Sequence, residues 1–188
     1  MEDLRARKTK KAIKEAMLAL LEEKSINKIT VAEISRAAQL GRGTFYLHYR
    51  DVYDLYEKME DEIFFELEEI YDGTIPNDNE SNLLKLTERI VSYIKANQQI
   101  ITLFVRPQGS GAALRKLKKI FYEKTIHETR MLLENPSDMK KDYIVEVVYI
   151  VSGVTGVLEE WILGGLNTSA DSVSKMLQKM ILKSQQQF

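Results

Sequence analysis

Polar and aromatic side chains recur at helical spacing in one short segment of the chain. It contains Arg42, Gly43, Thr44, Tyr46 and His48 at positions where a buried helix would carry aliphatic residues. An arginine can donate two hydrogen bonds to a guanine edge or bind a phosphate, and a threonine can contact a thymine methyl group. Hydroxyl and imidazole groups suit phosphate oxygens. The glycine lets the backbone approach a partner closely, at a cost of about 1 kcal/mol in helix propensity. This combination favours contact with double-stranded DNA.

The distribution of charge points to the same end of the chain. Residues 1–50 carry a formal charge of +5 and residues 51–188 one of −6, although the net charge is only −1. Five basic side chains form an arm ahead of the first expected helix, namely Arg5, Arg7, Lys8, Lys10 and Lys11. Such an arm attracts a polyanion independently of its sequence. Chance clustering on solvated helix faces explains the charges equally well, so they support a DNA partner only together with the polar segment.

Two short amphipathic helices joined by a turn are expected to position the polar segment. Thr30 and Glu33 form a capping-box pattern that opens the first of them. Gly41 follows its last turn and is expected in the left-handed conformation that ends many helices. The second helix is expected over residues 42–49, with Phe45 on its buried face. A short helix with a polar exposed face after such a turn matches the reading helix of a helix-turn-helix.

Helical periodicity continues through nearly the whole chain. Asp51 caps a long fourth helix, and the prolines at positions 76, 107 and 136 fall between helical patterns. Segment 143–157 is rich in Val and Ile, but its apolar residues keep the spacing of a buried helix. The sequence therefore predicts an all-α fold of about nine helices. A helix-turn-helix DNA-binding domain of residues 1–50 would precede an effector-binding and dimerisation domain of residues 51–188, built as a helical bundle.

Several classes of function are disfavoured. The chain has no cysteine, no glycine-rich phosphate loop and no paired histidine–carboxylate cluster, so an enzyme, a cofactor or a metal site is not expected. His127 has no potential ligands at useful spacing. The longest apolar stretch, residues 143–166, contains three glutamates, which disfavours a membrane span. Because no secretory signal opens the chain, a cytoplasmic protein is expected.

The segment ITVAEISRAAQLGRGTFYLHYRDVYDL resembles the N-terminal signature of TetR-family transcriptional regulators. The resemblance implies an all-α homodimer with an N-terminal reading head and a larger effector and dimerisation domain. Carried over position by position, it implies DNA contacts at Thr30, Arg42, Gly43, Thr44, Tyr46, His48 and Tyr49. Tyr49 is equally compatible with a core position. Many members have a phosphate-binding lysine where this chain has Val52. Arg50 is the candidate to replace it, and the alternative is a lower affinity for DNA.

The penultimate helix carries a surface suited to dimerisation. Its small residues Gly153 and Gly156 would allow close approach of a second helix, and Val157 and Trp161 extend an apolar surface beyond them. Pairing of the last two helices with their copies would form a four-helix bundle. The segment GVTGVLEEWILGGL also resembles the penultimate helix of TetR-like regulators. The alternative is that this helix forms the central core of a single chain.

The resemblance further implies an effector cavity enclosed by the fourth to eighth helices. Seven large side chains are candidates to line it: Phe64, Tyr93, Phe104, Phe121, Tyr122, Met131 and Tyr149. Each of them is also compatible with an ordinary core position. The ligand expected for such a lining is a small apolar or aromatic molecule.

The function favoured by these observations is a dimeric repressor. Effector binding would tilt the fourth helix and change the spacing of the two reading helices, so that they no longer match a palindromic operator. The alternative is an activator or co-regulator with the same DNA-binding head, controlled by a protein partner in place of a small ligand.

Overall fold

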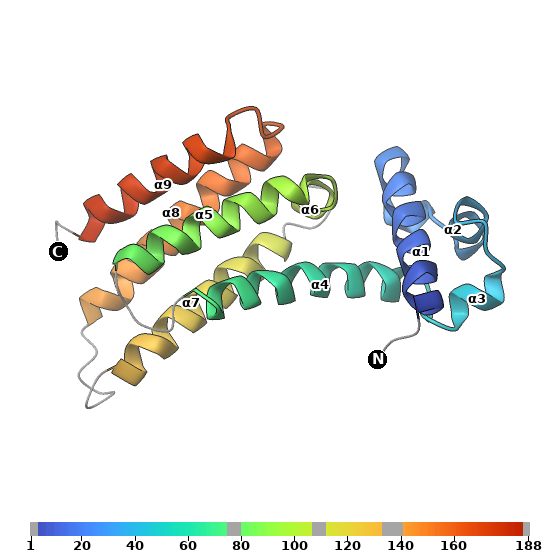
Figure 1. Cartoon of the computed structure of the whole chain (residues 1–188), viewed down its shortest axis with the longest axis horizontal. Helices are drawn as coiled ribbons and strands as arrows, with labels where there is room; N and C mark the ends of the chain where they lie inside the picture. The colour runs from blue at the N-terminus through green and yellow to red at the C-terminus, as the bar shows by residue number, and fades with distance from the viewer. Residues whose placement is uncertain (1–3, 75–79, 107–111, 133–140, 186–188) are drawn as a thin grey trace. The chain divides into compact units, whose positions relative to one another are not determined.

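The computed structural model describes residues 4–74, 80–106, 112–132 and 141–185. The described residues form nine α-helices and one 3₁₀ turn, with no strand (Figure 1). Their bounds are α1 Leu4–Glu23, η1 Ile26–Lys28, α2 Val31–Ala37, α3 Arg42–Tyr46, α4 Val52–Asp72, α5 Glu80–Ala96, α6 Gln98–Val105, α7 Ala112–Leu132, α8 Lys141–Leu163 and α9 Ala170–Gln185. The predicted all-α fold is confirmed. The three prolines lie outside the described residues.

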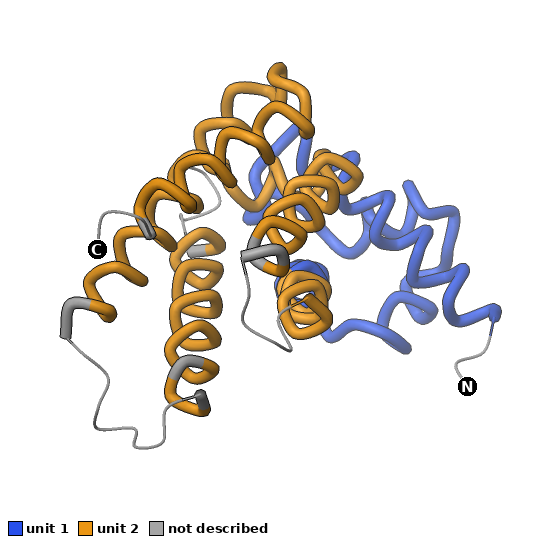
Figure 2. Tube along the Cα trace, turned by 60° about the vertical axis from the view of Figure 1, so that its left-hand side comes forward, with its two compact units in different colours: residues 1–63 blue, residues 64–188 orange. Residues whose placement is uncertain are grey.

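The chain divides into two compact units, residues 1–63 (unit 1) and 64–188 (unit 2), coloured separately in Figure 2. The division falls inside α4, later in the chain than the expected boundary between residues 50 and 51. The reason lies in the first half of α4, which supplies the fully buried Leu55 and Met59 to unit 1. One continuous helix therefore belongs to both units.

Unit 1 is a small helical head built on an apolar core. Helix α2 packs against both α1 and α3. The side chains of Ile13, Met17, Ile34 and Phe45 are completely buried, and they come from all three of these helices. An ion pair between Lys14 and Glu62 also joins α1 to α4 within the unit. Burial of this set fixes the orientation of α3, because its central side chain, Phe45, is anchored in the core.

Unit 2 is a bundle in which helices distant in sequence lie side by side. Helix α5 packs along α9, and α8 contacts α6, α7 and α9 (Figure 1). The Gln178 amide on α9 donates a hydrogen bond of 2.8 Å to the Leu84 carbonyl on α5. The segment of high strand propensity lies within α8, as its spacing predicts, because helical packing buries Val147, Thr155 and Leu158 on one face. No described helix is long and apolar enough to cross a membrane.

Candidate nucleic-acid interface

The capping box predicted at the start of α2 is present. The Thr30 hydroxyl accepts a hydrogen bond of 3.3 Å from the Glu33 backbone, and the Glu33 carboxylate accepts one of 3.0 Å from the Thr30 backbone. The same hydroxyl donates to the carboxylate at 2.9 Å. The single hydroxyl hydrogen of Thr30 is therefore used inside the protein, and a phosphate contact would require it to leave Glu33.

The turn between α2 and α3 differs from the sequence prediction in one residue. The left-handed residue is Gln39, with φ of 56°, whereas Gly41 has φ of −70°. Leu40 donates its backbone N–H to the Ser35 carbonyl at 2.8 Å and Gln39 donates to that of Arg36 at 3.1 Å. These two bonds form a Schellman motif, which places the left-handed residue directly after the helix cap. Gly41 serves as the N-cap of α3, so the expected conformation at Gly41 is wrong.

Helix α3 presents most of the predicted contact residues to solvent. Arg42, Gly43 and Tyr46 are exposed, and Thr44 is half-buried. Arg42 makes no hydrogen bond or ion pair with any described residue. A side chain added at Gly43 would meet no atom within 4 Å apart from the backbone of its own helix and its chain neighbours, so the backbone is accessible there. The exposed face of α3 thus carries unused donors and an open backbone, as groove contacts require.

The residues after α3 separate into contact candidates and core. The helix ends at Tyr46, three residues earlier than expected. His48 is half-buried, while Tyr49 is only 4% exposed and packs against Phe45 at 5.6 Å between ring centroids. Tyr49 therefore belongs to the core of unit 1, the alternative that the sequence left open, and its predicted DNA contact is not supported. Leu47 was missed by the sequence prediction, although it is one of the most exposed apolar side chains of the unit.

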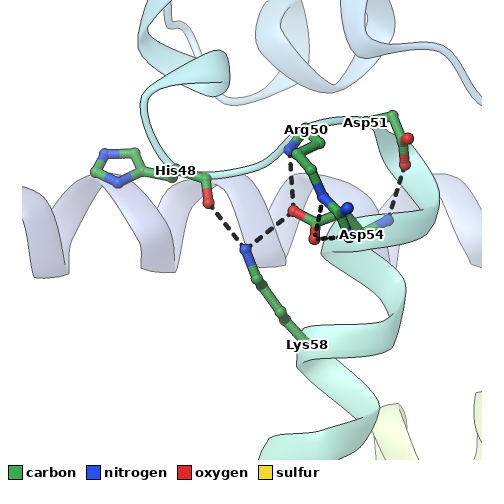
Figure 3. A network of polar contacts seen from close by, with 5 residues as sticks. All are labelled: His48, Arg50, Asp51, Asp54 and Lys58. Carbon is green, nitrogen blue, oxygen red and sulfur yellow. Dashed lines mark hydrogen bonds and ion pairs between the residues drawn. The ribbon is translucent and has the colours of Figure 1, made fainter.

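A network of polar contacts joins the end of the reading segment, residues 42–50, to the start of α4 (Figure 3). Asp51 caps α4, because its carboxylate accepts the Asp54 backbone N–H at 2.8 Å. The Asp54 carboxylate accepts from the backbone of Arg50 at 2.9 Å and from its guanidinium at 3.0 and 3.1 Å. Lys58 donates to the same carboxylate at 3.0 Å and to the His48 carbonyl at 3.3 Å. The network fixes the backbone on both sides of residue 49.

Val52 and Tyr53 show how α4 begins. Val52 is buried, so the position at which the family resemblance places a lysine is part of the core. Tyr53, the next residue, is exposed and offers a phenol hydroxyl at the first turn of the helix. Tyr53 is therefore a further contact candidate that sequence reasoning did not name, and its place two residues after the expected Asp51 cap is the signal that could have pointed to it.

Two carboxylates in unit 1 are held in their charged form. Hydrogen bonds from the Lys24 side chain, at 2.5 Å, and from Thr30 lower the pKa of Glu33 to about 2. The backbone N–H of Arg50 and the side chain of Lys58 lower the pKa of Asp54 to about 2. Glu33 belongs to the capping box of α2 and Asp54 to the polar network at the start of α4, and both carboxylates are ionised throughout the neutral range.

The basic residues at the N-terminus lie on a helix. The expected arm of Arg5, Arg7, Lys8, Lys10 and Lys11 falls on the first turns of α1, which begins at Leu4. All five are exposed or half-buried. They form a basic stretch of regular helix, and the prediction that they precede the first helix is wrong because helical periodicity already starts at Leu4.

The predicted effector residues fall into two groups in unit 2. Phe64, Phe104 and Phe121 are buried, and Tyr93 and Tyr122 are half-buried. Met131 and Tyr149, in contrast, are 73% and 68% exposed. These two side chains therefore do not line the interior of a single chain. Their sequence positions fit a buried helix face, but no described residue covers them on α7 and α8.

A polar group lies inside the mainly apolar unit 2. The Tyr71 hydroxyl hydrogen-bonds to the Thr125 hydroxyl at 3.0 Å and to the Glu128 carboxylate at 3.4 Å. Its ring stacks on Phe121, with 5.9 Å between centroids. Burial raises the pKa of Tyr71, so its hydroxyl is protonated and able to donate. Lys116 lies 4.3 Å from the centre of the Phe64 ring.

The predicted dimer residues lie on different faces of α8. Gly153 is exposed, and Gly156 and Val157 are half-buried. Trp161 is 7% exposed and donates its indole N–H to the Thr168 carbonyl at 2.9 Å, so it belongs to the core of the chain itself and the structure does not support its predicted dimer contact. Other apolar side chains of α8 and α9 are exposed, and we call them the apolar stripe: Val145, Val148, Tyr149, Leu163, Met176 and Met180.

Two family models match the chain. Residues 81–183, more than half of the chain, match the family described as "Transcriptional regulator C-terminal region". Residues 13–59 match the family described as "Bacterial regulatory proteins, tetR family". The uncharacterized HTH-type transcriptional regulator YxbF of Bacillus subtilis (strain 168) is 44% identical over 45 residues, which are 24% of this chain and 12% of that protein. The matched segment is thus a small part of that relative.

Solved structures share the fold over nearly the whole chain. The fatty acid degradation regulator FadR from Bacillus halodurans superposes with a TM-score of 0.65 at 12% identity, covering 97% of this chain and 96% of that one. NalD, the secondary repressor of the MexAB-OprM multidrug efflux pump in Pseudomonas aeruginosa, gives a TM-score of 0.67 at 15% identity, covering 97% and 98%. Identities at this level show a common fold.

Proposed function

Since the chain belongs to the TetR family of transcriptional regulators, we propose that it is a homodimeric repressor released from a palindromic operator by a small-molecule effector. The observation that carries the proposal is the exposed face of α3. Arg42 there has no partner among the described residues, and Gly43 leaves the backbone open. A helix anchored by a buried Phe45 and exposing unused donors is suited to the major groove.

The proposed dimer uses the exposed apolar stripe of α8 and α9. Side chains at Val148, Tyr149 and Met180 are left in water by the single chain. Burial of apolar surface is worth roughly 25 cal/mol per Å², so a second copy placed on this stripe would gain stability. Gly153 supports the same face, because a side chain added there meets no atom within 4 Å and a second helix could approach. Two-fold pairing implies a palindromic operator.

The proposed effector site lies in the interior of unit 2. Its candidate lining combines the buried aromatic rings with the polar group formed by the Tyr71 hydroxyl, Thr125 and Glu128. Aromatic walls with a few polar groups are typical of small-molecule sites. Because α4 belongs to both units, displacement of its second half would be transmitted to the head. The expected ligand is a small apolar or aromatic molecule with one hydrogen-bonding group.

The DNA-binding part of the proposal is tested by selecting genomic fragments with the purified protein. Enrichment of fragments that share an inverted repeat is the expected result. Arg42→Ala should lose the preference for these fragments, whereas Arg130→Ala, an exposed arginine on α7, should keep it. Fragments without a common repeat would overturn the proposed operator recognition.

A reporter gene placed behind the selected repeat tests repression and release. Expression of the wild-type protein should lower reporter output, and growth with the inducing compound should restore it. A rise in output would favour the activator alternative. Compounds from a library of small aromatic acids and amphiphiles can be screened first by their effect on thermal stability, since ligands that bind the folded state raise it.

A further inference from the structure

Asp54 is a buried carboxylate whose acceptor capacity is fully used. Its side chain is 6% exposed. One oxygen accepts the Nε–H and an Nη2–H of Arg50, and the other accepts the Arg50 backbone N–H and the Lys58 ammonium. Four accepted bonds match the number of lone-pair sites on a carboxylate. Asp54 therefore has no capacity for a hydrogen bond to a further partner such as DNA.

Arg50 is held by Asp54 and yet remains open to solvent. Its side chain is 81% exposed. Two of the five guanidinium N–H groups bond to one oxygen of Asp54, so the other N–H groups stay available to an outside acceptor. Figure 3 shows the guanidinium bent back over the start of α4 beside Asp54. An arginine restrained in this way loses less side-chain entropy when it binds a phosphate.

We propose that Asp54 is a positioning residue for DNA binding, which holds the exposed guanidinium of Arg50 ready for a backbone phosphate. The proposal rests on the proposed DNA-binding function and extends it to a residue that faces away from solvent. Lys58 shares the carboxylate and donates to the His48 carbonyl, so the same group also ties the end of the reading segment to α4. Contact with a phosphate contributes affinity without sequence preference.

Two explanations of the role of Asp54, its own charge and its positioning of Arg50, make opposite predictions for DNA binding by the neutral variant Asp54→Asn. If Asp54 acted only through its charge, removal of a carboxylate near DNA would strengthen binding to a polyanion. If it positions Arg50, the amide would hold the guanidinium less firmly and binding would weaken. Glu57→Gln is the matched control, because this exposed carboxylate on the same helix has no hydrogen-bonded partner among the described residues. The control should bind DNA as tightly as the wild type or more tightly.

The experiment measures binding of the full-length chain to a labelled duplex of mixed sequence over a range of salt concentrations. A lost phosphate contact lowers the slope of log K against log salt by about 0.9. Arg50→Ala should lower the slope by about this amount. Asp54→Asn should bind the duplex more weakly than wild type and lower the slope by a smaller amount. In the Arg50→Ala background, Asp54→Asn should no longer weaken binding, since there is no guanidinium left to position. Thermal melting and sedimentation of each variant report on its fold and its oligomeric state.

Arg50→Lys is a second test that leaves Asp54 unchanged. A lysine keeps the positive charge but cannot make the two side-on hydrogen bonds to one oxygen of Asp54. We expect weaker binding than wild type. Wild-type affinity for Arg50→Lys, or tighter binding by a folded Asp54→Asn, would overturn the positioning role. If the wild-type protein itself failed to bind any duplex, the proposed function would fail instead. The two failures are therefore distinguishable.

Discussion

Gln39 holds the left-handed conformation in the turn that sets α3 against α2. A non-glycine residue in this conformation costs about 1–2 kcal/mol. Gln39, with φ of 56°, must keep this conformation as long as the two Schellman hydrogen bonds are made. Gln39→Gly removes that strain but makes the unfolded chain more flexible. We expect a net gain of up to about 1 kcal/mol in the free energy of unfolding, measured by urea denaturation.

Gly41→Ala is the informative comparison, because φ of −70° suits any residue and the added carbon would lie 4.0 Å from the nearest atom, the Thr44 hydroxyl oxygen. Stability within about 0.5 kcal/mol of wild type is expected. A large loss at Gly41 together with no gain at Gln39 would contradict the turn described above.

Two tyrosines three residues apart should respond in opposite ways to truncation. Tyr49→Ala removes a ring that is 4% exposed, so the free energy of unfolding should fall by about 3 kcal/mol or more. Tyr46→Ala removes an exposed ring from α3, so stability should change by less than about 0.5 kcal/mol while affinity for the operator falls. Chemical denaturation and a binding titration on both variants check this division of roles. Equal losses of stability would show that α3 is less exposed than the structure has it.

At the scale of the elements, two ionised carboxylates at the starts of helices make unit 1 sensitive to acid. The pKa of Glu33 falls from 4.5 to about 2 and that of Asp54 from 3.8 to about 2. A lowered folded-state pKa stabilises the fold above the unfolded value and loses this effect as the pH falls through the folded value. Melting temperature should therefore decline between about pH 4.5 and pH 2. Glu33→Gln should melt lower at neutral pH and show a shallower decline, measured by circular dichroism.

Glu66→Gln provides the control for this acid sensitivity, because it removes an exposed carboxylate on α4 that caps no helix. It should reproduce the wild-type decline. An identical pH profile for Glu33→Gln would show that the capping box contributes nothing to the acid response.

The elements also show which features sequence reasoning could reach. The capping box of Thr30 and Glu33 is local, since its residues lie within one turn of helix, and it was predicted correctly. The helical state of residues 143–157 followed from spacing over several turns. The left-handed Gln39 was not predicted, because the same turn can be closed with glycine at a neighbouring position. The burial of Trp161 inside its own chain was not predicted. Periodicity within one helix shows that a face is apolar, but it does not show whether that face packs on the same chain or on a second copy.

At the scale of the whole molecule, the proposed function requires two separate surfaces, one for DNA on unit 1 and one for a second copy on unit 2. Each surface carries a helical glycine, Gly43 on α3 and Gly153 on α8. Both are exposed, and a side chain at either would meet no atom within 4 Å. The two positions are therefore matched, since substitution should leave the isolated fold intact and gains helix propensity of a few tenths of a kcal/mol or more.

Glutamate at each position should produce reciprocal defects. Gly43→Glu places a carboxylate where a phosphate-rich groove is expected, so DNA binding should be lost while the dimer persists. Gly153→Glu places a charge in an apolar contact between two copies, so the dimer should dissociate in sedimentation experiments. Because each half-site alone binds weakly, operator affinity should then fall with the dimer and recover as protein concentration rises. A Gly153→Glu protein that remains dimeric would place the interface elsewhere on unit 2, and the exposed stripe of α8 and α9 would need another partner.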